Sequence, residues 1–116
     1  MSEIPMVNRS LLVIRPKQPF IDWLKNLPDP SEVTVEECSQ DATSFLIPDF
    51  EDDEERDEII VEFYPTLFDE ALLEWWSDQK DWPKHRDLKM FYDWFQVDFH
   101  SLVLDLGIEP LSSEED

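Results

Sequence analysis

Glycine and cysteine are almost missing from this sequence. Its 116 residues include one glycine, Gly107, and one cysteine, Cys38. A chain with one glycine has no glycine-rich loop of the kind that holds phosphate groups. A chain with one cysteine forms no internal disulfide, which is typical of proteins from reducing compartments. These two absences argue against a phosphate-binding loop and against a disulfide-stabilised fold.

Long hydrophobic runs are also missing. No apolar run approaches the roughly 18 residues that span a membrane, and the first ten residues, MSEIPMVNRS, contain neither the basic nor the apolar region of a secretory signal. We therefore expect a cytoplasmic protein that does not bind a membrane.

Basic residues are few. The chain has 9 lysines and arginines against 29 aspartates and glutamates, for a formal net charge of −20. Between Asp29 and Gln79 there are 18 acidic residues and one basic residue, Arg56, so this segment carries −17 of the total. Such a field repels nucleic acid and attracts basic protein surfaces. Direct binding to nucleic acid is therefore not expected.

Apolar residues are nevertheless abundant. They make up 41% of the chain and include five tryptophans and eight phenylalanines, which is too apolar for a disordered acidic tail. The length suits one domain. We predict one globular domain over residues 9–107, preceded by a loose N-terminus (1–8) and followed by a flexible acidic tail (108–116).

The first half of the chain predicts two strands and two helices. Leu11–Ile14 is a short apolar run that indicates a strand. Helical spacing of apolar residues predicts a helix over 19–27, which Pro28 ends. Thr34 and Glu37 have the spacing of a capping box, which predicts a short helix over 35–40. The run from Thr43 to Ile47 indicates a second strand.

The second half predicts longer helical segments and a third strand. An apolar stripe from Ile59 to Trp76 repeats at steps of three and four residues. Because Pro65 interrupts it, the segment is expected to be one kinked helix or two helices in sequence. Asp87 is expected to cap a further helix over 88–95. Residues 97–106 are expected to form the last strand.

This order of elements predicts an α+β fold. The simplest architecture is a small three-stranded sheet with four to five helices packed against it, and a three-layer α/β arrangement is the alternative. The core residues are expected to lie on the apolar stripes, and they are Trp23, Phe63, Phe68, Leu72 and Phe91.

One run of acidic residues suggests a functional hypothesis. Seven of the eight residues from Glu51 to Glu58 are acidic. An EF-hand loop that began at Asp49 would need glycine at position six and glutamate at position twelve, but Glu54 and Ile60 occupy these positions. Acidic residues in the first turn of a helix stabilise it through the helix dipole. A helix start needs only two or three of them, so the excess motivates a functional hypothesis, although a solvated helix start remains the favoured explanation of the run.

The first functional hypothesis is a non-enzymatic module that binds a basic protein surface. Two variants fit this class: an immunity or antitoxin protein that covers a basic nuclease, and a mimic of DNA. The candidate partner-binding residues are Glu51, Asp52, Asp53, Glu54, Glu55, Asp57, Glu58, Glu62, Asp69 and Glu70.

The alternative is an enzyme that depends on a divalent metal. Asp49, Glu51, Asp52 and Asp53 would then supply oxygen ligands for magnesium or manganese. No histidine lies in this segment to act as a base. The spacing also lacks the geometry of a specific site, so we expect neither a metal nor another cofactor and no catalytic residue.

Three segments carry a resemblance to a known family. They are VNRSLLVIRPKQPFIDWLKNLPD, FLIPDFEDDEE and WPKHRDLKMFYDWFQVDFHSLVLDL. Together they resemble a family of small acidic bacterial proteins of uncharacterised function, over roughly residues 7–106. The resemblance implies a bacterial cytosolic setting and assigns no activity.

Overall fold

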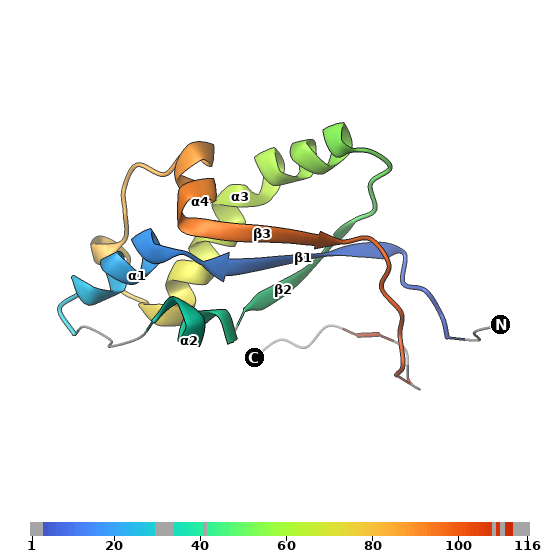
Figure 1. Ribbon diagram of the computed structural model, residues 1–116, viewed down its shortest axis with the longest axis horizontal. Helices are drawn as coiled ribbons and strands as arrows, with labels where there is room; N and C mark the ends of the chain where they lie inside the picture. Colours follow the sequence, from blue (N-terminus) through green and yellow to red (C-terminus); the bar gives the residue numbers. More distant parts are fainter. Residues whose placement is uncertain (1–3, 30–33, 41, 108, 110, 113–116) are drawn as a thin grey trace.

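The structure is a computed structural model that describes residues 4–29, 34–40, 42–107, 109 and 111–112. Within these ranges the chain has an α+β fold with a three-stranded antiparallel sheet and four α-helices (Figure 1). The elements in chain order are β1 (Arg9–Pro16), α1 (Gln18–Lys25), α2 (Val35–Gln40), β2 (Thr43–Pro48), α3 (Asp53–Trp75), a 3₁₀ turn η1 (Gln79–Asp81), α4 (Leu88–Trp94) and β3 (Phe95–His100).

Strand β1 lies at the centre of the sheet, whose order is β2-β1-β3. Both neighbours run antiparallel to it, and Ile14 is opposite Thr43 on one side and Val97 on the other. Residues of β1 therefore alternate between two faces of the sheet. Leu12 and Ile14 point to the buried face and belong to the hydrophobic core.

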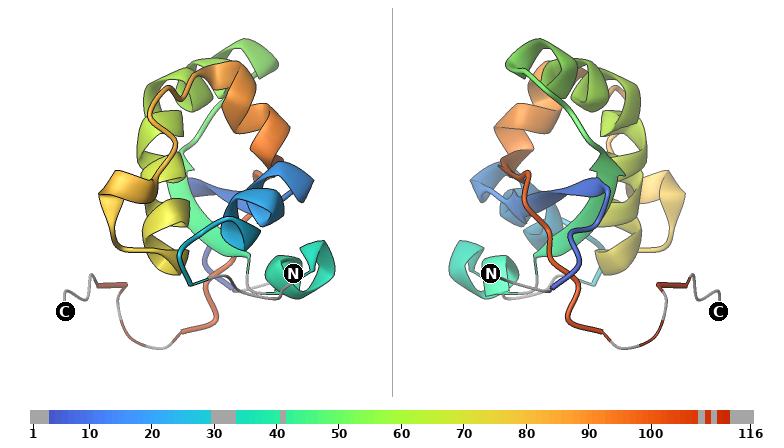
Figure 2. Two further views of the ribbon diagram at one scale, coloured as in Figure 1. Left: turned by 90° about the vertical axis from the view of Figure 1, so that its left-hand side faces the viewer. Right: turned by 90° about the vertical axis from the view of Figure 1, so that its right-hand side faces the viewer.

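The helices cover one face of the sheet. Figure 2 shows α3 and α4 on one side of the strands and the chain that follows β3 on the other side. The core forms between the sheet and the helices, with Ile21 and Leu24 from α1, Leu72 from α3 and Phe91 from α4. On the opposite face Leu46 is exposed.

Two local capping signals are confirmed. The Thr34 hydroxyl accepts the Glu37 backbone N–H at 3.2 Å, and α2 covers residues 35–40 as predicted. The Asp87 carboxylate accepts the Met90 backbone N–H at 2.8 Å at the start of α4. In both places the side chain satisfies an N–H group that the helix itself leaves unpaired.

Helix α3 runs without a break past Pro65, so the two-helix alternative is wrong. It begins at Asp53, six residues before the apolar stripe begins at Ile59. Proline lacks an N–H and crowds the preceding turn, which bends a helix without necessarily ending it. The ribbon of α3 changes direction along its length in Figure 1.

The third strand was misplaced by the sequence prediction. It covers Phe95–His100 instead of residues 97–106, and α4 ends one residue before it. Phe95 pairs with Pro16 at one end and His100 pairs with Leu11 at the other. Apolar residues alternate from Phe95 to Phe99 and again from Leu102 to Leu106, but the phase changes between the two runs. The pairing with β1 ends at this change of phase.

Three of the five predicted core residues are fully buried, namely Phe68, Leu72 and Phe91. Trp23 and Phe63 are partly buried and pack against the core from its edge. Trp23 keeps contact with the surface because its indole N–H donates to the Asp81 carbonyl at 3.0 Å. An aromatic residue with a polar end is commonly placed at such an edge.

Neighbouring leucines on α3 give a matched test of the core. Leu72 is fully buried and Leu73 is 48% exposed. We expect Leu72→Ala to lower the free energy of unfolding by ~2–5 kcal/mol, because it removes buried methyl groups and leaves a cavity. Leu73→Ala should change it by no more than about 0.5 kcal/mol. Urea unfolding of both variants measures the difference in the free energy of unfolding. Equal losses of stability would mean that α3 does not turn the side with Leu72 toward the core.

Candidate functional site

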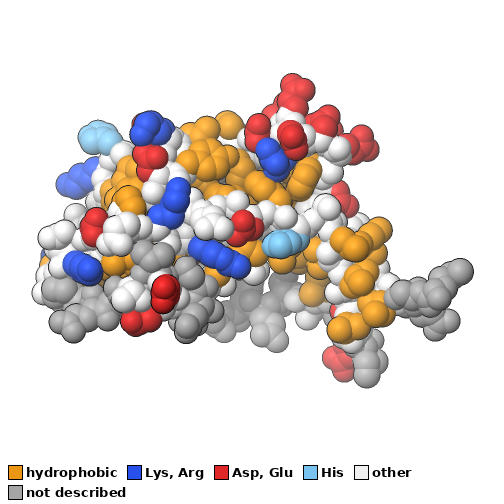
Figure 3. Space-filling view, in the orientation of Figure 1, with side chains coloured by type: hydrophobic (Ala, Val, Ile, Leu, Met, Phe, Trp, Pro, Cys, Tyr) orange, Lys and Arg blue, Asp and Glu red, His pale blue; other side chains and the backbone are white. Residues whose placement is uncertain are grey.

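The acidic run forms the N-terminal end of α3 and the turn before it. Figure 3 shows its carboxylates gathered at one end of the molecule. Every acidic residue from Glu51 to Glu58 is exposed, as is Glu62 one turn further along α3. The structure therefore brings together eight of the ten candidate partner-binding residues on one helical segment.

Two of these residues build the helix start. The Asp52 carboxylate accepts the Glu55 backbone N–H at 2.8 Å, and the Glu55 carboxylate accepts the Glu51 backbone N–H at 2.8 Å. This reciprocal arrangement is close to a capping box and pairs two backbone donors. Asp52 and Glu55 therefore have a structural role whatever else the segment does.

Arg56 compensates two further carboxylates. Its guanidinium lies 3.4 Å from Asp53 and 3.5 Å from Asp57. The same group stands over the Phe99 ring, 5.4 Å from its centroid. Arg56 therefore ties the first turn of α3 to the sheet. The ion pairs themselves are exposed, and exposed pairs add little stability.

A second set of carboxylates has no such compensation. Glu54, Glu58 and Glu62 follow one another at steps of four residues and therefore lie along one side of α3. Among the described residues, no hydrogen bond or ion pair involves their carboxylates or that of Glu51. Like charges at this spacing repel one another.

These side chains surround an exposed apolar residue. Val61 is 56% exposed. It lies in a shallow, open depression whose lining residues define the acidic face: Glu54, Asp57, Glu58, Val61 and Glu62. Sequence reasoning missed Val61, although its position three residues after Glu58 and four after Asp57 puts it on the same side of the helix.

Asp69 and Glu70 lie apart from the acidic face. Asp69 is about 16 Å further along the helix than Glu58. Its carboxylate pairs with Arg86, whose guanidinium also stands over the Phe68 ring at 5.3 Å from the centroid. Asp69 therefore fastens the loop before α4 to α3. Glu70 is exposed next to it.

The proposed metal ligands do not converge. Asp49 accepts the Ser10 hydroxyl at 3.0 Å, Asp52 caps the helix and Asp53 pairs with Arg56. Within the ranges that the structure describes, no three histidine, cysteine, aspartate or glutamate side chains lie close enough to hold a metal ion. Each of these carboxylates has a different partner, and none of these contacts brings it close to the others.

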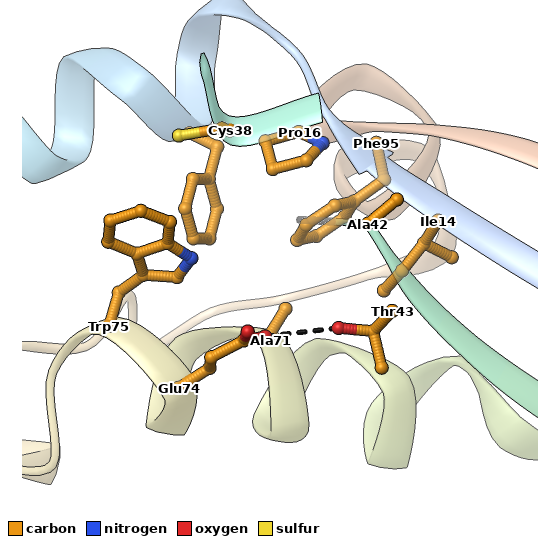
Figure 4. Close-up of a pocket in the computed structure, with 10 residues that line it drawn as sticks. Ile14, Pro16, Cys38, Ala42, Thr43, Ala71, Glu74, Trp75 and Phe95 are labelled. Atoms are coloured by element: carbon orange, nitrogen blue, oxygen red, sulfur yellow. Dashed lines mark hydrogen bonds between the residues drawn. The ribbon is translucent and has the colours of Figure 1, made fainter. Parts of the chain in front are cut away.

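A small cavity lies where α2 and β2 meet the C-terminal half of α3 (Figure 4). Its volume is about 10 Å³, which is the lower limit for a single water molecule. Ile14, Cys38, Ala71 and Phe95 contribute apolar walls, and the Thr43 hydroxyl bonds to Glu74 at 3.0 Å across its edge. A substrate or an organic cofactor does not fit into this cavity.

Tyr92 of α4 is a neighbour of the acidic run that the sequence did not indicate. Burial raises the pKa of its phenol, and the negative charge of Asp57 raises it further, while Arg56 opposes them. Tyr92 is still 40% exposed. The charged run is thus bordered by an accessible aromatic side chain from another helix.

A comparison of the chain with protein-family models, with curated proteins and with solved structures finds no match. Among the described residues, no helix combines the length and the apolarity needed to cross a membrane. The arrangement of side chains at α3 is therefore the basis for a functional hypothesis.

The two sets of carboxylates should differ in their effect on stability. Asp52→Ala removes the cap, and we expect it to lower stability by ~0.5–2 kcal/mol. Glu58→Gln combined with Glu62→Gln changes residues beyond the first helical turn and relieves repulsion, so stability should stay level or rise at low salt. Thermal melts in low-salt buffer test both. A fall for the double variant as large as that for Asp52→Ala would show that these glutamates stabilise the fold.

The position of Tyr92 predicts a second effect. Asp57→Asn removes a negative charge that disfavours the phenolate, so the pKa of Tyr92 should fall but stay above its ordinary value because of burial. The raised pKa stabilises the fold below the ordinary value of 10.0, and this contribution is lost as the pH rises through the folded-state pKa. An NMR titration of the Tyr92 ring measures the shift, with Glu36→Gln as the control. An unchanged pKa of Tyr92 in Asp57→Asn would mean that the charge of Asp57 does not act on the Tyr92 phenol.

Proposed function

We propose that the protein is a non-enzymatic binding module whose acidic face contacts a basic surface of another protein. The observation that supports this most is the row formed by Glu54, Glu58 and Glu62, which has no compensating cation among the described residues. The helix start is already completed by Asp52 and Glu55. Glu54 lies in the first turn of α3 and interacts favourably with the helix dipole. The fold does not require Glu58 and Glu62, and the repulsion along the row opposes folding.

The chemistry of the acidic face fits a protein partner. Clustered negative charge speeds encounter with a basic surface and disfavours acidic competitors. Val61 and Tyr92 add exposed apolar contacts within and beside the charged row. An apolar centre that becomes dry on binding, surrounded by charged groups, is the usual construction of a specific interface.

Charge density favours an immunity- or antitoxin-like module over a mimic of DNA. From Glu54 to Glu62 the helix advances about 12 Å, so the four carboxylates of the acidic face supply one charge per ~3 Å. Duplex DNA carries one charge per about 1.7 Å of its axis. The acidic face has about half of that density and lies on a single helix. A basic protein partner is therefore the better match.

The resemblance to small acidic bacterial proteins forms part of the same proposal. The resemblance implies a bacterial cytosolic setting for the module and its partner. A single cysteine that is buried as Cys38 fits the reducing conditions there.

A pair of variants with equal net charge tests the proposal. The first is Glu54→Gln, Glu58→Gln and Glu62→Gln. The control changes three exposed acidic residues elsewhere: Asp29→Asn, Glu36→Gln and Glu109→Gln. Each variant and the wild type are immobilised and exposed to a bacterial lysate at low and at high salt, and retained proteins are identified by mass spectrometry.

We expect the wild type and the control to retain the same basic protein at low salt. The acidic-face variant should bind it at least about tenfold more weakly, because the complementary charges are lost. Its remaining binding should also depend less on salt, because fewer charges are left to be screened. Equal weakening in both variants would mean that only net charge matters, and the proposal would fail.

A further inference from the structure

The outer edge of β3 carries backbone groups that no other described segment pairs with. In the register of β1 with β3, the Lys17 N–H donates to the Trp94 carbonyl at 2.8 Å. Hydrogen-bonded pairs recur at every second position of an antiparallel ladder. The backbone groups of every second residue after Trp94 therefore turn toward β1, and those of Val97 and Phe99 turn away from it. Among the described residues, no other segment hydrogen-bonds to this edge.

The other edge of the sheet is protected in a way that the edge of β3 is not. Successive residues of β1 turn their backbone groups to its two neighbours, and the same alternation places the nitrogen of Pro48 on the outer edge of β2. Proline has no N–H to offer to another strand, and proteins place proline or lysine on exposed edges to prevent pairing. The six residues of β3, FQVDFH, include neither of them. The edge of β3 is therefore open to an added strand.

An apolar strip runs beside this edge. The side chains of Val97 and Phe99 turn toward the helices and are partly buried against the core. Arg56 lies over the Phe99 ring, and its charge also acts on the Tyr92 phenol, so these side chains meet at one end of the strip. Figure 1 shows β3 at the front of the sheet with no other element across it. In Figure 3 hydrophobic side chains are visible between the position of β3 and the N-terminal half of α3.

The chemistry of the edge fits an extended peptide segment. Outward N–H and C=O groups at every second residue are matched by the backbone of another strand, which gains affinity from these hydrogen bonds. Successive side chains of an added strand point to opposite faces of the sheet. Those on one face would lie on Val97 and Phe99, and those on the other face would lie beside Asp98, which is 35% exposed.

Charge indicates that the segment is basic. The Asp98 carboxylate is 3.7 Å from the Arg15 guanidinium, which is too long for a hydrogen bond and leaves acceptor capacity on the carboxylate. The acidic first turn of α3 lies near the end of β3, because Arg56 contacts both Asp53 and the Phe99 ring. An acidic segment is repelled by these groups, and a second copy of the chain, with a charge of −20, is repelled as well.

We propose that the outer edge of β3 binds an extended basic segment of the partner, which adds a fourth strand to the sheet. Apolar residues of the segment lie on Val97 and Phe99, and lysine or arginine at the alternate positions reaches Asp98. This proposal rests on the proposed function for the nature of the partner. It adds a contact of the backbone, which gives the partner an orientation that charge alone does not.

A peptide that alternates valine and lysine, acetyl-VKVKVK-amide, tests the proposal. The full-length protein is titrated with this peptide, and the hydrogen exchange of its backbone amides is followed by NMR. We expect the exchange of the Val97 and Phe99 amides to slow at least about tenfold at saturation, because a new strand protects them. The amides of Ser44 and Leu46 on the outer edge of β2 should keep their rates. Unchanged exchange of Val97 and Phe99 at saturation would refute the proposal.

Two control peptides separate backbone pairing from other contacts. Residues directly opposite Val97 and Phe99 share their face, so the valine N–H groups of the peptide are those that face β3. Methylation of the valine nitrogens keeps all charges and side chains but removes these donors, and it should abolish the protection. The acidic peptide acetyl-VEVEVE-amide should also give none. Equal protection by either control would refute the proposal, because backbone pairing or basic charge would then not be required.

A matched pair of substitutions locates the contact. Val97→Pro removes an N–H that points away from β1, and Leu46→Pro removes the corresponding N–H on the outer edge of β2. Proline is tolerated at such positions because no hydrogen bond of the sheet is lost. The peptide should bind at least about tenfold more weakly to Val97→Pro and unchanged to Leu46→Pro. Circular dichroism checks the fold of both. The comparison of the two valine–lysine peptides on the wild type needs no substitution and decides the question if a variant fails to fold.

The outcomes separate this proposal from the proposed function. If glutamine at positions 54, 58 and 62 abolishes binding of the basic partner but the peptide leaves β3 unprotected, the acidic face stands and the strand addition is refuted. If the peptide protects β3 but these glutamines leave the partner bound, the acidic face is refuted instead. Protection of Val97 and Phe99 that appears without peptide, as the protein concentration rises, would assign the edge to a second copy and overturn the proposal.

Discussion

The packing of four phenylalanines, one from each of α1, α3, α4 and β3, is the constraint on which the rest of the structure depends. Phe95 of β3 lies 5.4 Å from Phe20, 5.2 Å from Phe68 and 5.4 Å from Phe91, measured between ring centroids. All four rings are fully buried. Aromatic pairs at such distances add to the free energy of area burial. Because Phe95 also pairs with Pro16 of β1, these contacts join the helices to the central strand.

The position of Phe68 in the C-terminal half of α3 explains how the acidic segment can stay exposed. The aromatic packing holds the helix beyond Pro65, and Ile59 and Ile60 bury one side of its N-terminal half. The opposite side remains free for the acidic face. Carboxylates in water interact through a high dielectric, at about 1 kcal/mol for a pair 4 Å apart. Their repulsion is therefore small compared with the stability of a typical domain.

The sequence predicted the elements better than their limits and their contacts. The short helix α2 and the start of α4 follow from caps that act within a few residues, Thr34 and Asp87. The end of β3 falls where the apolar alternation changes phase between Phe99 and Leu102, and the prediction of one strand over residues 97–106 overlooked this change. At the site, the acidic cluster was visible in the sequence. Which of its carboxylates cap α3, which pair with Arg56 and which lack a compensating charge could be assigned only once the position of the first helical turn was known. The pairing of Asp69 with Arg86 could be recognised only from the tertiary fold, because the two residues lie on different segments of the chain.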